Sequence, residues 1–126
     1  GFDQLAHIHR RKTGAMFNVC LRLGGIVGGA TDEQLSALNS YGKKLGLAFQ
    51  IVDDILDFQG DEVSMGKRTG KDHALGKLTF TSLMGADESR RQATELIDEA
   101  CAELKLFGAT GNEIDALARY VLERNQ

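Results

Sequence analysis

The sequence predicts an all-α domain. The chain contains no proline and few runs of β-branched residues, and its apolar residues recur at steps of three and four, the spacing of a helix face. With 126 residues, of which 42% are hydrophobic and 26% charged, the chain is long enough for one domain with a buried core. We therefore expect a bundle of packed helices.

The first residues already have the pattern of a helix interior, without a convincing N-cap. The pattern continues to about residue 27, and the glycine pairs at 24–25 and 28–29 indicate where the helix ends. The apolar positions that define this first helix are Phe2, Leu5, Ile8, Met16, Val19, Cys20, Leu23, Ile26 and Val27.

A second helix is predicted from residue 31 to about Phe58. Thr31 is a suitable N-cap, and Asp32 and Glu33 place acids in the first turn, where they interact favourably with the helix dipole. The apolar face of this helix comprises Leu35, Leu38, Tyr41, Leu45, Ala48, Phe49, Val52, Ile55 and Leu56.

The remainder of the chain is predicted to be a long loop and three further helices. Residues 59–73 are glycine-rich, polar and aperiodic, which indicates a loop, and a loop this long inside a compact domain is usually functional. Helix-period patterns then predict a short helix at about Leu75–Met84, an amphipathic helix at about Asp87–Phe107 and a last helix at about Asn112–Arg124.

Three carboxylates lie inside the apolar run 48–58, at Asp53, Asp54 and Asp57. On a helix Asp53 and Asp57 fall within about 40° of each other and Asp54 lies beside them, so that one face carries all three. Neighbouring negative charges raise one another's pKa, and partial burial adds a desolvation cost, unless a cation compensates them. Because carboxylate oxygens and phosphate oxygens are typical Mg²⁺ ligands, the pattern favours a site that holds a phosphate through the metal.

The alternative is that these acids lie on a solvated helix face. Carboxylates near the C-terminal end of a helix oppose its dipole, by about 0.3 to 1 kcal/mol each at an exposed position. Their apolar neighbours also leave them little fully wet surface. We therefore favour metal binding over a solvated face.

Basic and hydroxyl side chains that could contact a phosphate occur in three places. Lys12 and Thr13 lie in the first helix, Lys67 and Lys71 lie in the glycine-rich loop, and Lys77 is expected at the start of the short helix. Lysine charge, hydroxyl donors and a glycine-rich backbone all suit a polyanion. Taken alone, Lys12 and Thr13 are equally compatible with a solvated surface, the glycine-rich loop is a weak signal, and Lys77 is more often a surface residue than a site residue.

Charge and composition exclude several other classes. The net charge is −3 and basic residues alternate with acids after residue 60, so nucleic-acid binding is disfavoured. No apolar run approaches the roughly 20 residues of a membrane span, so we expect no membrane span and a cytoplasmic location. Cys20 and Cys101 lack disulfide or thiolate-site spacing and are expected to be buried thiols, and His7, His9 and His73 lack zinc spacing.

Taken together, these segments resemble the C-terminal half of a trans-prenyltransferase (polyprenyl synthase), most closely the bacterial farnesyl diphosphate synthase or geranyltranstransferase type. The resemblance spans essentially the whole chain, including its ending at residues 124–126. The segments that carry it are Lys12-Thr13, the Phe-Gln-Ile-Val-Asp-Asp-Ile-Leu-Asp run at 49–57, Gly66-Lys67, Gly70-Lys71-Asp72 and Gly76-Lys77-Leu78-Thr79.

The resemblance implies a helical bundle of the isoprenoid synthase fold that binds two substrates, an allylic diphosphate and isopentenyl diphosphate. In this family Mg²⁺ ions between two aspartate-rich motifs hold the allylic diphosphate. Ionisation of that diphosphate gives an allylic cation, which the double bond of isopentenyl diphosphate attacks. The implied parent enzyme extends dimethylallyl or geranyl diphosphate to farnesyl or a similar short-chain prenyl diphosphate and releases diphosphate.

The resemblance also implies a metal set and a catalytic set. Asp53, Asp54 and Asp57 would form the second aspartate motif and bind Mg²⁺, with Asp53 the best candidate for direct metal contact. Thr13 and Gln50 would line the place where cationic charge develops.

The implied substrate-binding residues surround this motif. Lys12 and Lys67 would grip the allylic diphosphate, Phe49 would flank the incoming isopentenyl diphosphate, and Lys77 would add a basic contact at the mouth of the site. Metal and lysine charges at these positions would stabilise the departing diphosphate as negative charge builds on it.

The chain lacks what the first half of such enzymes carries, including the other aspartate motif. We therefore expect residues 1–126 to be the C-terminal part of a single synthase domain without its N-terminal half, inactive alone and prone to form a homodimer or a helix-exchanged oligomer. The alternative hypothesis is a non-catalytic helical interaction subunit of a heteromeric synthase, because a halved bundle leaves apolar helix faces uncovered.

Overall fold

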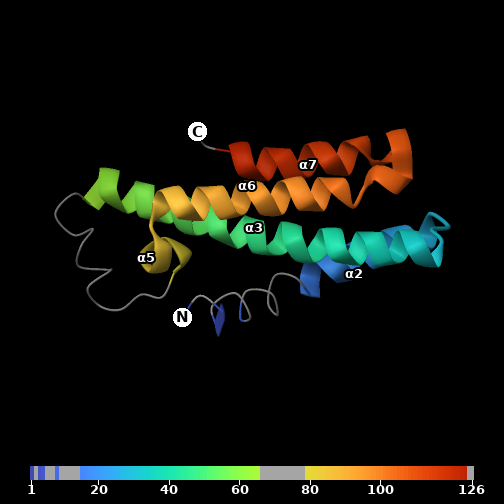
Figure 1. The fold of residues 1–126 in the computed structure, drawn as a ribbon, viewed down its shortest axis with the longest axis horizontal. Coiled ribbons are helices and arrows are strands. Elements are labelled where there is room, and N and C mark those ends of the chain that lie inside the picture. The colour runs from blue at the N-terminus through green and yellow to red at the C-terminus, as the bar shows by residue number, and fades with distance from the viewer. Residues whose placement is uncertain (2, 5–7, 9–14, 66–78, 125–126) are drawn as a thin grey trace.

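The structure, a computed structural model, describes residues 1, 3–4, 8, 15–65 and 79–124, with the backbone alone for residues 61–65. The predicted all-α class is confirmed, since these ranges contain helices and no strand. Figure 1 shows the four longest helices, α2, α3, α6 and α7, lying side by side along the long axis. The elements are α2 (Ala15–Val27), α3 (Asp32–Met65), α5 (Phe80–Met84), α6 (Ala86–Ala102), the 3₁₀ segment η3 (Lys105–Gly111) and α7 (Asn112–Glu123).

The predicted start of α3 is confirmed in detail. The backbone N–H of Gln34 donates to the Thr31 hydroxyl over 3.1 Å, and the Thr31 N–H donates to the Gln34 side-chain oxygen over 2.9 Å. This reciprocal pair is a capping box, which satisfies two backbone donors at the helix start. Asp32 and Glu33 occupy the first turn, as expected from the helix dipole.

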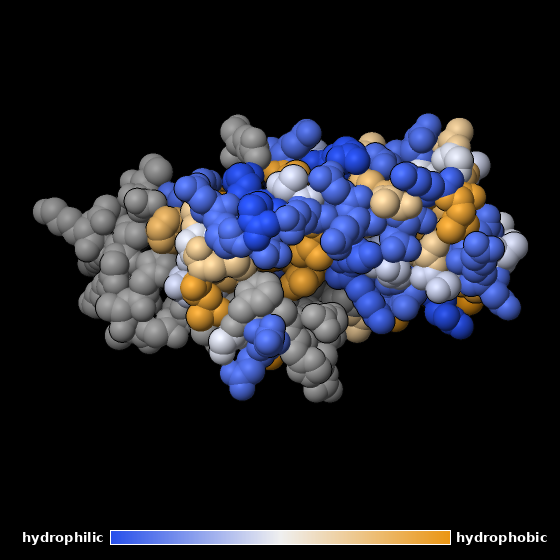
Figure 2. All heavy atoms as spheres, in the orientation of Figure 1, coloured by the Kyte–Doolittle hydropathy of each residue, from blue (hydrophilic) through white to orange (hydrophobic). Residues whose placement is uncertain are grey.

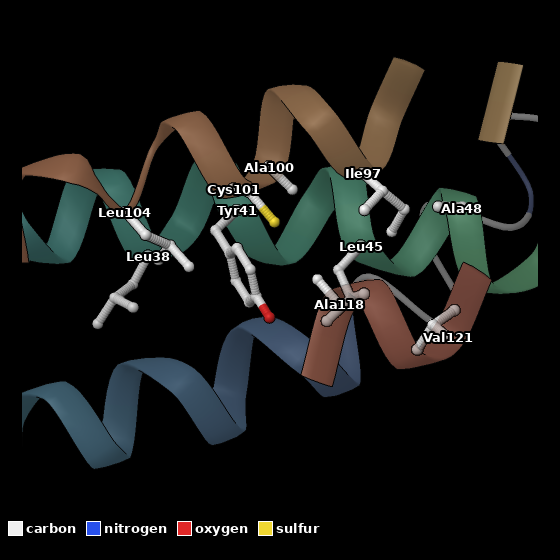
Figure 3. Packing of buried hydrophobic residues seen from close by; sticks show 10 residues of the cluster. All are labelled: Leu38, Tyr41, Leu45, Ala48, Ile97, Ala100, Cys101, Leu104, Ala118 and Val121. Carbon is white, nitrogen blue, oxygen red and sulfur yellow. The ribbon is translucent and has the colours of Figure 1, made fainter. Parts of the chain in front are cut away.

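The hydrophobic core lies where α3, α6 and α7 meet, and Figure 3 shows its side chains directed toward one another from these helices. A second, smaller cluster lies at the C-terminal end of α3, against α5 and the start of α6. The main cluster consists of Leu38, Tyr41, Leu45, Ala48, Ile97, Ala100, Cys101, Leu104, Ala118 and Val121, and the smaller one of Ile51, Val52, Ile55, Phe80 and Ala93.

The predicted ends of two helices are wrong. The helix α3 continues to Met65 rather than ending near Phe58, so the first part of the expected 59–73 loop is helical, and the rest of that loop lies outside the described residues. The helix α6 ends at Ala102 rather than Phe107, and the chain turns at Gly108, whose φ of +58° favours glycine. Leu104 and Phe107 follow the end of α6 but still pack on the core, which explains why the apolar pattern in the sequence extends beyond the helix.

The short helix also differs from its prediction. Thr79 has an extended backbone and caps α5, because its hydroxyl accepts from the Ser82 N–H and the Ser82 hydroxyl accepts from the Thr79 N–H. The helix therefore begins at Phe80 rather than at Leu75, and residues 75–78 lie outside the described residues.

The helix α2 packs on α3 through a different face from the one that the sequence pattern indicates. Phe17 and Leu21 contact the core, whereas Met16 and Val27 are 69% and 88% exposed. The helices approach closely at Gly25, where a Cβ would lie 2.8 Å from the end of the Leu35 side chain and would require that side chain to shift. Among the other members of the expected face that the structure describes, Val19, Leu23 and Ile26 are exposed, and Phe2 and Leu5 lie outside the described residues.

The cysteines differ in their surroundings. Cys101 is buried, as predicted, and burial raises the pKa of its thiol to about 11. Cys20 is exposed on α2, so the prediction of two buried thiols is wrong for this residue. Within the described ranges, no helix combines the length and the apolar character needed to cross a bilayer.

Figure 2 shows one face of the molecule, on which hydrophilic side chains predominate and separate small apolar patches. The exposed apolar side chains are instead concentrated on α2, whose single charged residue is Arg22. A helix that is apolar nearly all round is normally covered on every side. The structure therefore leaves one face of α2 without a packing partner among the described residues.

Candidate functional site

The C-terminal half of α3 carries the predicted site residues Phe49, Gln50, Asp53, Asp54 and Asp57. Buried Ile51, Val52 and Ile55 fix this part of the helix against its neighbours. Phe49, Asp53 and Asp57 follow one another at intervals of about one turn and therefore share a side of the helix. The Asp53 side chain is 35% exposed and Asp57 is exposed, so both carboxylates remain accessible to a ligand.

Asp53 forms an ion pair with Arg124, the residue that follows α7. The Arg124 Nη2 group donates to Asp53 Oδ1 and also to the Phe49 carbonyl oxygen over 3.4 Å. The guanidinium carbon lies 4.3 Å from the centroid of the Phe49 ring, an arrangement in which the cation is attracted to the ring face. The sequence assigns no role to Arg124. The resemblance of residues 124–126 to the family's ending is its only sequence signal.

The negative charge of Asp53 is incompletely compensated. Burial raises the pKa of Asp53 above its ordinary value, the Arg124 charge and hydrogen bond lower it, and the neighbouring Asp57 carboxylate raises it. The net direction is upward although an arginine is in contact. A further cation near Asp53 and Asp57 would therefore be electrostatically favourable.

Asp54 has a different surrounding from Asp53. Its Oδ2 accepts a hydrogen bond of 2.9 Å from the Phe80 N–H, so that this carboxylate connects α3 to the first turn of α5. Among the described residues, no group of three or more histidine, cysteine, aspartate or glutamate side chains is arranged to hold a metal ion. The structure thus brings Asp53 and Asp57 into electrostatic contact and directs Asp54 toward α5.

The other predicted site residues divide into two groups. Phe49 and Gln50 are both partly buried, and the Phe49 ring packs edge-on against Phe17 of α2 with 5.9 Å between centroids. The predicted basic and hydroxyl contacts lie outside the described residues: Lys12, Thr13, Lys67 and Lys77.

The donor set of Asp53 and Asp57 fits magnesium. Mg²⁺ is commonly held by one or two protein carboxylates together with water and substrate phosphate oxygens, so a full cage of protein ligands is not required. The two acids provide hard oxygen ligands, and the pKa of Asp53 is raised chiefly by burial and further by the Asp57 carboxylate. These two residues are those that would hold the ion.

A groove of about 440 Å³ lies at the other end of the molecule. It is bordered by Leu21 and Gly25 of α2, by Leu38 of α3 and by Phe107 and Ile114 near the start of α7. Because its α3 residues come from the N-terminal turns of that helix, this groove is separate from the acids near the C-terminal end.

Comparison with solved structures places this fold in the class of the prenyl diphosphate synthases. It superposes with a TM-score of 0.78 and 37% identity on an apo FPP/GFPP synthase from Zymomonas mobilis, covering 93% of this chain and 37% of that one. A decaprenyl diphosphate synthase from Rhodobacter capsulatus gives a TM-score of 0.71 with 30% identity, over 98% of this chain and 50% of that one.

The chain belongs to the polyprenyl synthetase family, whose model matches residues 1–108. Among curated relatives, farnesyl diphosphate synthase of Escherichia coli (strain K12) is 41% identical over 98% of this chain and 43% of its own length. A dimethylallyltranstransferase of Fischerella ambigua (strain UTEX 1903) is 43% identical over 95% of this chain and 35% of its own length. The chain therefore spans less than half the length of these relatives.

Proposed function

We propose that this chain is the C-terminal part of a magnesium-dependent trans-prenyltransferase. The complete enzyme would join dimethylallyl or geranyl diphosphate to isopentenyl diphosphate and form farnesyl or a similar short-chain prenyl diphosphate. The observation that carries the proposal is that Asp53, which is 35% exposed, and the exposed Asp57 share one side of α3, where both carboxylates are accessible to a ligand. The names of the E. coli and Fischerella relatives support the same reaction class.

In the proposed reaction the allylic carbon–oxygen bond breaks, its electron pair leaves with diphosphate, a carbon–carbon bond forms, and loss of one proton restores a double bond. Magnesium, when bound, supplies positive charge that stabilises the departing diphosphate. Asp53 and Asp57 would hold the ion. Asp54 is also proposed as a metal ligand, because it belongs to the same aspartate motif in the sequence. Lys12 and Lys67 would bind the diphosphate oxygens.

The remaining proposed residues act on the hydrocarbon part of the reaction. Thr13 and Gln50 would present oxygen atoms toward the developing allylic cation, which their dipoles stabilise. Phe49 would flank isopentenyl diphosphate, and Lys77 would contact the diphosphate at the mouth of the site. The Phe49 ring is held by Phe17 and Arg124, so it has a fixed position from which to contact a substrate.

The first experiment compares this chain with a completed enzyme. A chimeric synthase is made by joining the chain to the part of the E. coli farnesyl diphosphate synthase that it does not match. With Mg²⁺, geranyl diphosphate and isopentenyl diphosphate, we expect farnesyl diphosphate from the chimeric synthase and none from the chain alone. Product from the chain alone would refute the proposed inactivity, and a folded chimeric synthase that forms no prenyl product would refute the proposed function.

The second experiment tests Asp53 in the chimeric synthase. Asp53→Asn keeps the shape of the side chain and removes its charge, and we expect kcat to fall by at least about a hundredfold, the equivalent of about 2.7 kcal/mol of lost transition-state stabilisation. Asp87→Asn, an exposed acid in the first turn of α6, is the control and should leave kcat unchanged. Equal kcat values for Asp53→Asn and wild type would contradict the proposal.

The exposed apolar face of α2 favours a second candidate, a helical interaction subunit. We define the α2 face as Met16, Val19, Leu23, Ile26 and Val27, all of which are more than half exposed. Apolar surface of this kind associates with a partner, which also supports the proposed homodimer or helix-exchanged oligomer. The cytoplasmic location stays a prediction.

A double charge substitution in the chain itself, compared with Asp53→Asn in the chimeric synthase, separates the two candidates. Val19→Asp with Leu23→Asp should disrupt assembly, as measured by analytical ultracentrifugation. Under the enzyme proposal, Asp53→Asn abolishes turnover while assembly persists. Unchanged turnover in Asp53→Asn, together with loss of a partner complex in the α2 variant, would favour the interaction subunit.

A further inference from the structure

Arg124 leaves the end of α7 and crosses to α3. Its N–H donates to the Tyr120 carbonyl over 2.9 Å, closing the last turn, and its backbone then becomes extended, with φ −58° and ψ 140°. The side chain is only 18% exposed, so most of its length is packed between the two helices. Arg124 therefore has a defined position at the C-terminal end of the fold rather than that of a free surface arginine.

The Arg124 guanidinium contacts α3 in three ways. It donates to the Asp53 carboxylate, donates to the Phe49 carbonyl oxygen over 3.4 Å, and lies over the Phe49 ring at 4.3 Å from its centroid. A planar guanidinium can stack on a ring and donate in its own plane at the same time, which a lysine ammonium cannot. Phe49 and Asp53 are both residues of the proposed site.

The contact with Asp53 uses one carboxylate oxygen. Arg124 binds Oδ1, and among the described residues no hydrogen bond to Oδ2 is formed. Carboxylates that bind a metal through one oxygen are commonly held through the other by a hydrogen-bond donor, which fixes their orientation. We propose that Arg124 is a positioning residue that holds Asp53 through Oδ1 and leaves Oδ2 to a magnesium–diphosphate ligand. This inference rests on the proposed function.

The opposite role, in which Arg124 occupies the cation site and is expelled by the metal, is less consistent with the contacts. Two of the three contacts involve Phe49 and do not depend on the Asp53 carboxylate. Expulsion would break both and expose a side chain that is packed between helices. Arg124 therefore stays on α3 when the ligand arrives, and its charge does not have to be replaced.

The test measures magnesium–pyrophosphate binding rather than turnover. The chimeric synthase is labelled with ¹³C in aspartate carboxyl groups and titrated with Mg²⁺ plus inorganic pyrophosphate, and the Kd is obtained from the NMR shift of Asp53. We compare wild type, Arg124→Lys, Arg124→Gln and the control Arg119→Gln. Arg119 lies in α7, the helix that Arg124 follows, but it pairs with Asp98 and Asp115 rather than with Asp53.

We expect the Kd to rise about tenfold in Arg124→Gln, in the range found when the partner of a metal ligand is removed, with partial rescue in Arg124→Lys. Arg119→Gln should bind like the wild type. An equal or lower Kd in Arg124→Gln would overturn the positioning role. Thermal melting of each variant shows whether a loss of affinity reflects unfolding. If Arg124→Gln unfolds, the role of Arg124 is tested in the wild-type protein instead.

The mutation-free measurement follows the ¹⁵N side-chain signals of Arg124 in the wild type. A positioning residue keeps its shifts near those of the ligand-free state as ligand saturates Asp53. A move to the values of a free arginine shows expulsion and overturns the inference. If Asp53 itself does not respond to the ligand, the proposed function fails and the positioning role with it, whereas a responsive Asp53 with unchanged Kd in Arg124→Gln refutes this inference alone.

Discussion

The two halves of α3 each bring a polar side chain to α7, and they differ in how that side chain is satisfied. In the N-terminal half, the buried Tyr41 hydroxyl donates to the Ile114 carbonyl over 2.6 Å inside the main core cluster. In the C-terminal half, the partly exposed Asp53 pairs with Arg124 and still has a raised pKa. The Tyr41–Ile114 hydrogen bond joins two neutral polar groups. In the Arg124–Asp53 pair, the arginine does not fully offset the cost of burying the Asp53 charge.

This difference separates structure from function within one helix. A buried hydroxyl that donates its one proton to a neighbouring carbonyl stabilises the fold, and its burial keeps it from contact with a ligand. An undercompensated carboxylate reduces stability and gains when a cation binds, which is typical of a functional site. We therefore expect substitutions in the N-terminal half to affect unfolding, and substitutions in the C-terminal half to affect ligand binding.

The largest expected effect on stability belongs to the core of the N-terminal half. Leu45 is 1% exposed, so Leu45→Ala removes buried methyl groups and leaves a cavity. The free energy of unfolding should fall by about 2 to 5 kcal/mol, measured by urea denaturation. Leu106→Ala, at a side chain that is 43% exposed, serves as the control and should have a much smaller effect.

Tyr41→Phe should produce the next largest effect. The substitution keeps the ring in the core and leaves the Ile114 carbonyl without its donor, which costs about 1 to 3 kcal/mol of unfolding free energy. Urea denaturation measures the loss, and the control Tyr120→Phe removes a hydroxyl from a ring that is 63% exposed. Equal stabilities of the two variants would mean that the Tyr41 hydrogen bond does not stabilise the fold.

Asp54→Ala should destabilise α5 locally. Its carboxylate accepts from the Phe80 N–H, and loss of such an acceptor at a helix start typically costs about 0.5 to 2 kcal/mol. Amide hydrogen exchange should accelerate over α5 and remain unchanged at Tyr41 and Leu45. Unaltered exchange in α5 would show that Asp54 does not hold this helix.

The smallest expected effect is on the pH dependence of the unfolding free energy, to which Asp53 and Glu88 contribute with opposite sign. The pKa of Asp53 is raised in the folded chain, chiefly by burial, so its contribution to stability is full below the unfolded value of 3.8 and is lost as pH rises through the folded pKa. The pKa of Glu88 is lowered, chiefly by its hydrogen bond from Arg91, so its contribution is present above 4.5 and is lost as pH falls.

Unfolding free energies measured between pH 3 and 7 test these signs. Relative to wild type, Asp53→Asn should gain stability as pH rises, and Glu88→Gln should lose it, because each variant lacks the titration of one acid. If the difference in unfolding free energy from wild type changed with pH in the same direction for both variants, the pKa directions of Asp53 and Glu88 would be contradicted.

The sequence was sufficient wherever the signal is local. The cap at Thr31 and the acids of the first turn of α3 follow from side chains within one turn of each other, and the structure confirms them. The apolar period correctly located the core face of α3, because a helix buries its apolar stripe. The family resemblance rested on several short motifs in order along the chain, each of them local, and the family is confirmed.

The features that the sequence did not predict depend on distant contacts. The packed face of α2 is the one that brings Phe17, Leu21 and Gly25 to α3, whereas the apolar pattern alone favours another face. Arg124 meets Asp53 across 71 positions of sequence, which no helical period encodes. The separation of Asp54 from Asp53 depends on α5, because the Phe80 N–H supplies the hydrogen bond that directs Asp54 away.

The comparison of the two halves of α3 is tested most directly by one NMR titration of the ¹⁵N-labelled chimeric synthase with Mg²⁺ and inorganic pyrophosphate. We expect amide shifts to change over residues 49–57, most strongly around Asp53, while residues 38–48 remain unperturbed. Uniform shifts along α3, or changes confined to the N-terminal half with Asp53 silent, would contradict the assignment of a magnesium–diphosphate site to this helix.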